Sequence, residues 1–169
     1  MLKSLVLTYS ALILVLNIVL YKFSIGPSFF KVTFSFFPLA LSGYLFGPWW
    51  SSILALFSNI LCFTIFGSGS FHPLFLMTAL LSGFISGLFL YRKNVNLVSV
   101  IITQLLLMVP LSLFLNSWFI ALVYGIDYHF VFLGRLWRNV GLIPIQIIMV
   151  YLLIKAFEKR KLLAQNKFR

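Results

Sequence analysis

The chain has 169 residues, of which 62% are hydrophobic and 9% are charged, and its 13 Lys and Arg residues face only two acids. A soluble domain of this length could not cover so much apolar surface, so the composition excludes that class. The net charge of +11 fits basic residues placed at the ends of apolar membrane spans, rather than a nucleic-acid-binding protein. The single cysteine, Cys62, excludes an internal disulfide.

Apolar runs separated by turn residues predict six membrane helices. In chain order we expect them at residues 2–21, 32–46, 49–66, 74–91, 97–123 and 134–157. Pro110 and Pro144 fall inside the last two, where neighbouring helices must satisfy the carbonyls that each proline frees. The predicted fold class is therefore an all-α integral membrane protein, with six transmembrane helices in a compact bundle. We expect a single membrane domain over residues 1–169, with a basic tail at about 158–169.

The charge distribution predicts the orientation in the membrane. The first apolar run lacks a small-x-small cleavage site and therefore predicts a retained helix. Six spans place both termini on one side, and nine of the 13 Lys and Arg fall on that side. By the positive-inside rule both termini are cytoplasmic, in a multi-pass protein of the cell membrane. The four cations of the outer side are Lys22, Lys31, Arg135 and Arg138.

Several kinds of chemistry are missing from the sequence. There is no G-x-x-x-x-G-K-[ST] phosphate loop, so ATP hydrolysis by this chain is not expected. The two acids, Asp127 and Glu158, are expected near opposite membrane faces and cannot form a catalytic pair. His72 and His129 have too few candidate co-ligands for a zinc site. We therefore expect neither an enzyme nor a cofactor or metal.

The outer cations are the first candidate site. Arg135 and Arg138 are about one helical turn apart and share a face, and the guanidinium fork fits carboxylates. Trp137 lies between them, and Trp118 is expected near the outer end of the fifth helix. Two interpretations stay open: a mouth for an anionic aromatic ligand, and ordinary anchoring of Trp and Arg at the membrane surface.

Polar side chains inside the spans are the second candidate. Asn59, Asn116 and Gln146 carry amides that must find partners in lipid, either on another helix or on a heteroaromatic ligand. His72, beside Phe71 in an outer loop, is either a loop residue or a ligand contact.

Small residues and the basic tail indicate surfaces for packing. The G-x-x-x-G pairs Gly43–Gly47 and Gly83–Gly87 allow close helix approach, either inside the bundle or against a partner subunit. The tail from Lys155 onward carries six cations and one acid, and attraction to anionic membrane lipid accounts for it without a specific partner.

Four stretches in order along the chain carry a resemblance to a known family. They are residues 36–48, residues 69–73, residues 81–88 and residues 115–146, which contain Leu115-Asn116-Ser117-Trp118, Arg135 and Ile143-Pro144-Ile145-Gln146. The chain resembles the substrate-binding S-components of energy-coupling factor (ECF) vitamin transporters, most closely the folate-specific family.

The resemblance implies a six-helix bundle that binds its vitamin from outside with very high affinity. It also implies a transmembrane coupling protein and two cytoplasmic ATPases, which drive the bundle to topple and release the vitamin inside. Within the class, another vitamin such as pantothenate or thiamine remains an alternative. Outside it, the alternative is a ligand-free, non-transporting membrane scaffold subunit.

The resemblance also implies roles for individual residues. Arg135, with Lys31 or Arg138, would pair the glutamate carboxylates of folate. Trp118 and Phe71 would stack on rings, and Asn59 and Asn116 would bond the pterin, although the family often has Asp where Asn59 stands. Residues 22–31 and 67–73 would act as lids. The full expected set is, for the ligand, Lys31, Asn59, Phe71, His72, Asn116, Trp118, Arg135 and Arg138 and, for the coupling protein, Ala11, Val15, Gly83 and Gly87.

Overall fold

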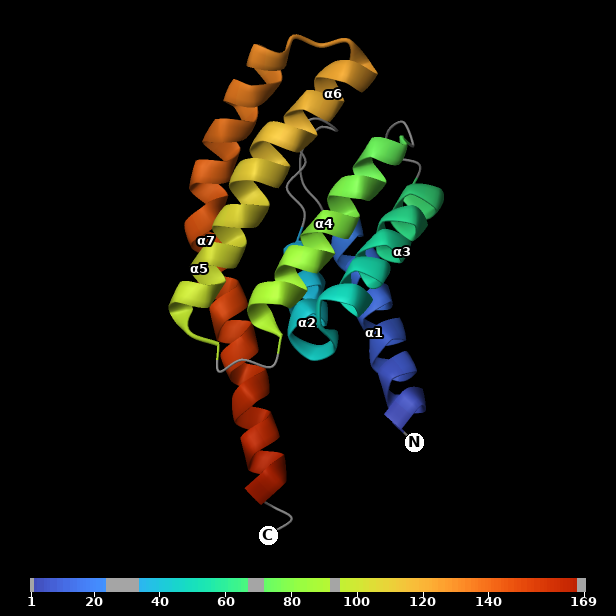
Figure 1. Ribbon diagram of the computed structural model, residues 1–169, viewed down its shortest axis with the longest axis vertical. Helices are drawn as coiled ribbons and strands as arrows, with labels where there is room; N and C mark the ends of the chain where they lie inside the picture. The colour runs from blue at the N-terminus through green and yellow to red at the C-terminus, as the bar shows by residue number, and fades with distance from the viewer. Residues whose placement is uncertain (1, 24–33, 67–71, 92–94, 167–169) are drawn as a thin grey trace.

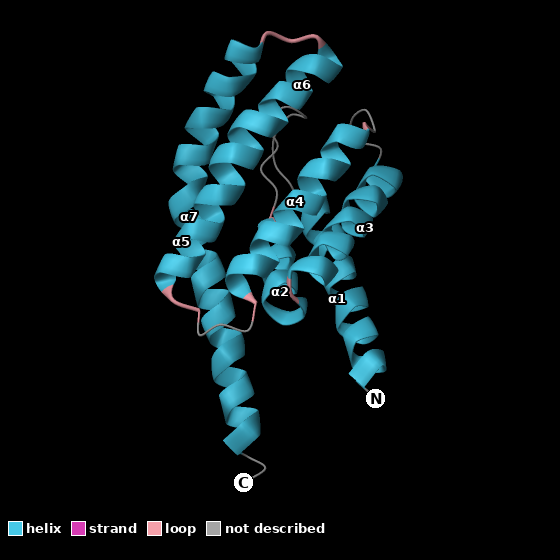
Figure 2. Cartoon of the chain, viewed as in Figure 1, coloured by secondary structure: helices cyan, strands magenta, loops and turns pink. Residues whose placement is uncertain are grey.

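The computed structural model describes residues 2–23, 34–66, 72–91 and 95–166, and all of its regular elements are helices (Figure 2). Three of these elements, α5, η1 and α6, run on without a break, so the described part contains six helical segments. In chain order the elements are α1 (Leu2–Lys22), α2 (Phe36–Phe46), α3 (Pro48–Phe66), α4 (Pro73–Leu90), α5 (Leu97–Leu106), η1 (Leu107–Leu115), α6 (Asn116–Tyr124) and α7 (Tyr128–Asn166).

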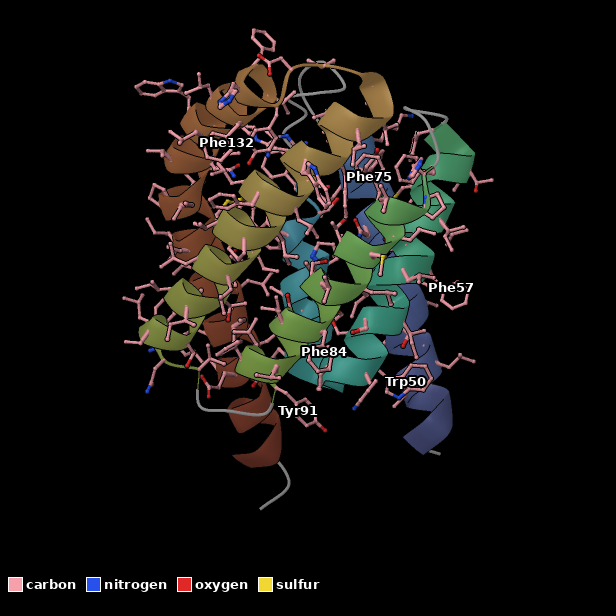
Figure 3. The ribbon with its side chains drawn as sticks, turned by 45° about the horizontal axis from the view of Figure 1, so that its top comes forward. Trp50, Phe57, Phe75, Phe84, Tyr91 and Phe132 are labelled. Carbon is pink, nitrogen blue, oxygen red and sulfur yellow. The ribbon has the colours of Figure 1, made fainter. Side chains whose placement is uncertain are left out.

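Four segments are long and apolar enough to cross a membrane: Pro48–Phe66, Pro73–Leu90, Leu97–Tyr124 and Tyr128–Lys159. Val6–Lys22 and Phe36–Phe46 are apolar but shorter. The two ends of the chain lie at the same end of the bundle, as an even number of crossings requires (Figure 1). The outer surface is apolar: Phe57 and Trp50, about half exposed, lie on the outside of α3 (Figure 3). Such a surface suits lipid.

Two helix starts differ from the prediction. α2 begins at Phe36 rather than at residue 32, since Phe34 and Ser35 are not helical. α7 begins at Tyr128, six residues before the expected start, and continues to Asn166. Gly125, with φ of 64°, ends α6, and the Asp127 carboxylate accepts a bond from the His129 N–H at 3.4 Å. This local cap starts α7 at Tyr128, six residues before the helix start that the sequence predicted.

Helices α2, α3 and α4 pack with their backbones in close contact. A Cβ added to Gly83 would lie 2.5 Å from the Ser51 carbonyl oxygen of α3, and one added to Gly87 would lie 2.4 Å from the Pro48 Cα. Gly43 of α2 is equally close to the backbone of α4. The buried hydroxyls of Ser42 and Ser51 are 2.8 Å apart and link α2 to α3. The small residues thus serve packing inside this bundle.

An apolar cluster closes the end of the bundle at which the chain termini lie. Its buried members come from α2, α4, α5, α7 and the segment before α5, and are Ala40, Tyr44, Leu90, Val95, Val100, Val150 and Ile154. This cluster fills the space between the helices at that end, so a cavity in the bundle lies toward the opposite end.

The α5–η1–α6 run lies alongside α7 in the opposite direction (Figure 1). Its central part is π-helical: at its end the Asn116 N–H bonds the Leu111 carbonyl, five residues back. Pro110 lies inside this part. A proline has no N–H and its ring clashes with the carbonyl four residues earlier, so widening the helix to the π form is one way to accommodate it.

Candidate ligand-binding cavity

The bundle contains a cavity of about 350 Å³, to which all six helical segments contribute. This volume is within the range of roughly 300–1,000 Å³ that is usual for small-molecule sites. Its polar lining includes Asn17, Tyr21, Ser35, Ser58, Asn59, Thr78, Ser82, Gln104, Ser112, Asn116, Arg135, Arg138 and Gln146. Two of the described lining residues are arginines and none is acidic. The cavity therefore suits a ligand that carries negative charge.

Arg135 and Arg138 of α7 donate hydrogen bonds to uncharged acceptors on the π-helical segment. Arg135, only 7% exposed, donates from Nη1 to the Ser112 carbonyl oxygen at 3.0 Å, while its buried Nε has no partner among the described residues. Arg138 donates from Nη2 to the Ser112 hydroxyl at 3.3 Å and to the Asn139 side-chain oxygen at 3.1 Å. These bonds orient the guanidinium groups through neutral acceptors, which do not cancel their charge.

Asn139 completes this network. Its Nδ2 donates to the Met108 carbonyl at 3.2 Å and to the Ser112 hydroxyl at 3.4 Å. Met108 and Ser112 are one turn apart on η1, and Arg135 and Asn139 are one turn apart on α7. In lipid, main-chain carbonyls that take donors from outside their own helix must find them on neighbouring helices, and here the carbonyls of Met108 and Ser112 accept from Asn139 and Arg135.

A second group of polar side chains is made of amides. Gln104 of α5 is 1% exposed and Gln146 of α7 is 4% exposed, and the side-chain oxygen of each lacks a hydrogen bond within the described residues. The side-chain oxygen of Asn116 also lacks a hydrogen bond within the described residues. An unbonded amide oxygen in a buried site costs about 1–3 kcal/mol. These groups are therefore candidates for contact with a ligand.

The structure brings together four of the residues expected at the ligand. Asn59 of α3, Asn116 of α6, and Arg135 and Arg138 of α7 all line the cavity. They come from three helices, and only packing of the bundle brings the two arginines near the two asparagines.

Two other expected ligand residues, Trp118 and His72, do not line the cavity. Trp118 does not line the cavity: it is 55% exposed and stacks on Phe119, with ring centroids 5.8 Å apart. His72 caps α4, where its Nδ1 accepts a bond from the Leu74 N–H at 3.4 Å, and it does not line the cavity. Lys31 and Phe71 fall outside the described residues, as does most of each expected lid.

The residues expected to dock the coupling protein separate into two groups. Ala11 and Val15 are exposed one turn apart on α1, Val15 at 60%. Gly83 and Gly87 are buried against the backbones of α3 and α2–α3. Only the α1 pair is open to a partner in this structure, while the glycine pair serves the interior.

Sequence reasoning missed Gln104 and Ser112 in the cavity wall and Asn139, which bonds Ser112 beside it. Asn139 follows Arg135 by four residues, so helical spacing alone could have predicted that the two share a face of the helix. Ser112 follows Pro110 by two residues, but only the structure shows that the π turn directs its carbonyl at α7.

The fold and the cavity together define a membrane-embedded helical bundle with a cationic cavity of a size that suits a small molecule. Comparison with known proteins gives the family. The family described as "ECF transporter, substrate-specific component" matches residues 5–157. The chain belongs to this family.

The named relatives and the similar solved structure carry the same protein name, FolT. The chain is 31% identical over 147 residues to the "Folate transporter FolT" of Clostridium novyi (strain NT), covering 86% of each chain. It is 28% identical over 152 residues to the protein of the same name from Leuconostoc mesenteroides subsp. mesenteroides, covering 85% of this chain and 81% of the relative. A crystal structure of FolT bound with folic acid has a TM-score of 0.81 and 30% identity, over 88% of this chain and 90% of that one.

Proposed function

We propose that this chain is the folate-binding subunit of an ECF-type importer, which captures the vitamin outside the cell. The observation that carries the proposal is the cavity with Arg135 and Arg138 in its wall and no acid among its described lining residues. Folic acid ends in a glutamate with two carboxylates, and guanidinium groups bind carboxylates in bidentate pairs. The names of the relatives and the folic-acid-bound structure support this choice of vitamin over pantothenate or thiamine.

Within the cavity, Arg135 and Arg138 pair the glutamate carboxylates, and Arg135 contributes the Nε that has no hydrogen bond among the described residues. Asn59 and Asn116 bond the heterocycle through amides that both donate and accept. Because Trp118 lies outside the cavity, ring stacking falls to other side chains, such as Tyr21 and Phe36 in the wall.

Release of the vitamin inside requires partners. The proposed partners are a transmembrane coupling protein, which contacts the exposed Ala11–Val15 face of α1, and two ATPases, whose ATP hydrolysis reorients the bundle. The termini are on the cytoplasmic side, in agreement with the positions of nine of the 13 basic residues.

The test is direct. The protein is purified in detergent from cells supplied with folate and denatured, and the released small molecules are identified by mass spectrometry. Near-stoichiometric folate is expected. Another vitamin keeps the transporter class and changes the ligand, whereas an empty protein that also fails to bind added folic acid contradicts the proposal and favours the scaffold alternative.

A substitution identifies the site. Arg135→Gln removes the charge but keeps a polar side chain, and we expect folic acid affinity to fall by at least about a hundredfold, near 2.8 kcal/mol. Titration calorimetry measures it, and unchanged affinity would remove Arg135 from the site. Trp118→Leu is the matched control outside the cavity and should bind as the unmodified chain does.

A further inference from the structure

The exposed apolar side chains form bands of unequal height on the two flanks of the bundle, α3 on one side and α5–η1–α6 with α7 on the other (Figure 1). On α3 the exposed large apolar residues run from Trp49 to Ile65, about 24 Å at about 1.5 Å per residue. On the α5–η1–α6 run they extend from Leu97 to Leu122, roughly 36 Å. The hydrocarbon core of a bilayer is about 30 Å thick, so the first band is too short for it and the second too long.

The excess height lies at the end opposite the chain termini. There α6 and the first turns of α7 form a hairpin, residues 116–134, which projects beyond the ends of α3 and α4 (Figure 1). We call this hairpin the α6–α7 tip. Ring contacts of Phe132 with Phe114 and with Tyr128, at centroid distances of 5.5 and 5.7 Å, pack its two arms together. The tip is therefore an ordered extension of two long apolar helices.

The surface of the tip suits lipid better than water. Its sequence contains one acid, Asp127, and no Lys or Arg. Four of its large apolar side chains are more than half exposed: Trp118, Leu122, Phe130 and Leu133. Soluble surfaces rarely expose apolar side chains in such a group without a partner.

The same uncharged surface continues from the tip along α7. Exposed large apolar residues follow each other from Phe130 to Leu152, about 33 Å at about 1.5 Å per residue, and the exposed cation Lys155 comes next. The side chains of the tip thus belong to the lipid-facing band of the helices that carry them.

Tilting the whole bundle does not remove the mismatch. The average tilt of membrane helices, about 20°, lengthens the path across the hydrocarbon core by only about 2 Å. A steeper tilt fits the long flank better, but it lowers the short flank by the same rotation and makes its fit worse. The bilayer must therefore differ in thickness between the two flanks if both bands are to stay in lipid.

We propose that the α6–α7 tip is a lipid-docking surface, immersed in the leaflet opposite the chain termini, and that the bilayer is thicker beside α5–α7 than beside α3. The occupant is bilayer lipid, because the tip continues a lipid-facing surface and offers no cation to an acidic partner. This inference goes beyond the proposed function and does not depend on folate. Deforming a bilayer costs energy that varies with its thickness, so thickness would contribute to the energy of the proposed reorientation.

The test places a fluorescent label, sensitive to its surroundings, at single cysteines in a Cys62→Ser background. Leu122→Cys and Phe130→Cys report on the tip. Ile148→Cys, exposed in the middle of the α7 band, and Lys159→Cys, exposed beyond it, are the matched controls. In phosphatidylcholine nanodiscs, which leave both faces accessible, spin-labelled lipid should quench the tip labels and the Ile148 label alike. Aqueous iodide should quench only the Lys159 label.

Nanodiscs of different acyl length test the unequal thickness. Shorter chains should expose the tip labels to iodide and leave the Ile148 label protected, whereas longer chains should keep all three in lipid. Tip labels that stay in lipid in the thinnest bilayer would overturn the unequal thickness, since tilting alone would then hold the tip. The two tip positions are independent, so one suffices where the other variant does not purify as a single species.

Two further outcomes would overturn the docking itself. Iodide quenching of the tip labels as strong as that at Lys159 would place the tip in water. Protection of the tip labels from both quenchers would mean that protein covers it, and cross-linking between the same cysteines would then identify a second copy. Failure of the labelled proteins to bind folic acid would bear on the proposed function alone, because the quenching measurements are made without ligand.

Discussion

Asn139 of α7 donates its side-chain amide to the main-chain carbonyl of Met108 at 3.2 Å, and through this bond the π-helical segment is tied to the helix that carries both arginines. The oxygen of the same amide accepts from Arg138 at 3.1 Å. One neutral, 3% exposed side chain thus satisfies a helix carbonyl and orients a guanidinium group without neutralising it. The cationic character of the cavity depends on that neutrality.

Replacing Asn139 by Asp should impair ligand binding more than folding. The variant loses the donor to Met108 and brings a carboxylate next to Arg138, where it pairs with the charge that a ligand would use. We expect folic acid affinity to drop by at least about tenfold, near 1.4 kcal/mol. Calorimetry measures the affinity. Asn96→Asp, at the exposed N-terminus of α5, is the matched control; equal binding by both variants would show that Asn139 does not set the charge.

The proline of the π-helical segment should matter, and the other helical proline should not. Pro110→Ala restores an N–H and removes the ring clash, which favours a regular helix and moves the Ser112 carbonyl away from Arg135. We expect weaker binding of folic acid with unchanged or higher thermal stability. Pro144→Ala alters an exposed residue that does not line the cavity. If the Pro110 variant keeps full affinity, the π turn is not what positions the arginines.

Alanine at the buried glycines should destabilise the bundle. In Gly87→Ala the new methyl group would lie 2.4 Å from Pro48 backbone atoms, which cannot move like a flexible side chain. Overpacking of this kind costs about 1–3 kcal/mol. Gly141→Ala meets nothing within 4 Å and should be neutral or stabilising, since alanine favours helix by up to about 1 kcal/mol. Melting temperatures in one detergent test this contrast, and similar values for both variants would refute it.

Cys62 offers a probe of the cavity that needs no engineering. It is the only cysteine of the chain, is 4% exposed and lines the cavity. Bound folic acid should slow its reaction with a small maleimide, because the ligand fills the space through which the reagent reaches the thiol. Mass spectrometry of the intact protein gives the rate, and Cys62→Ser confirms the labelled position. A rate unaffected by saturating folic acid would mean that the ligand binds elsewhere.

Much of the fold was readable from the sequence because its signals are local. Apolar runs broken by Gly47-Pro48 and by other turn residues predicted the helical segments, and each run specifies its helix without reference to the others. The start of α7 was missed because Asp127, a capping residue, counts as polar in a hydropathy reading. The shared face of Arg135 and Arg138 also followed from helical spacing alone.

The sequence by itself therefore determined a basic, membrane-embedded helical protein with a pair of arginines on one helix face, since hydropathy, charge and helical period are properties of neighbouring residues. Only the tertiary structure decided that Trp118 is exposed away from the cavity while Gln104, Asn116 and Gln146 line it. It also decided that the carbonyls of a π turn meet Arg135 and Asn139. These relationships join residues more than twenty positions apart, and their geometry depends on how the helices pack.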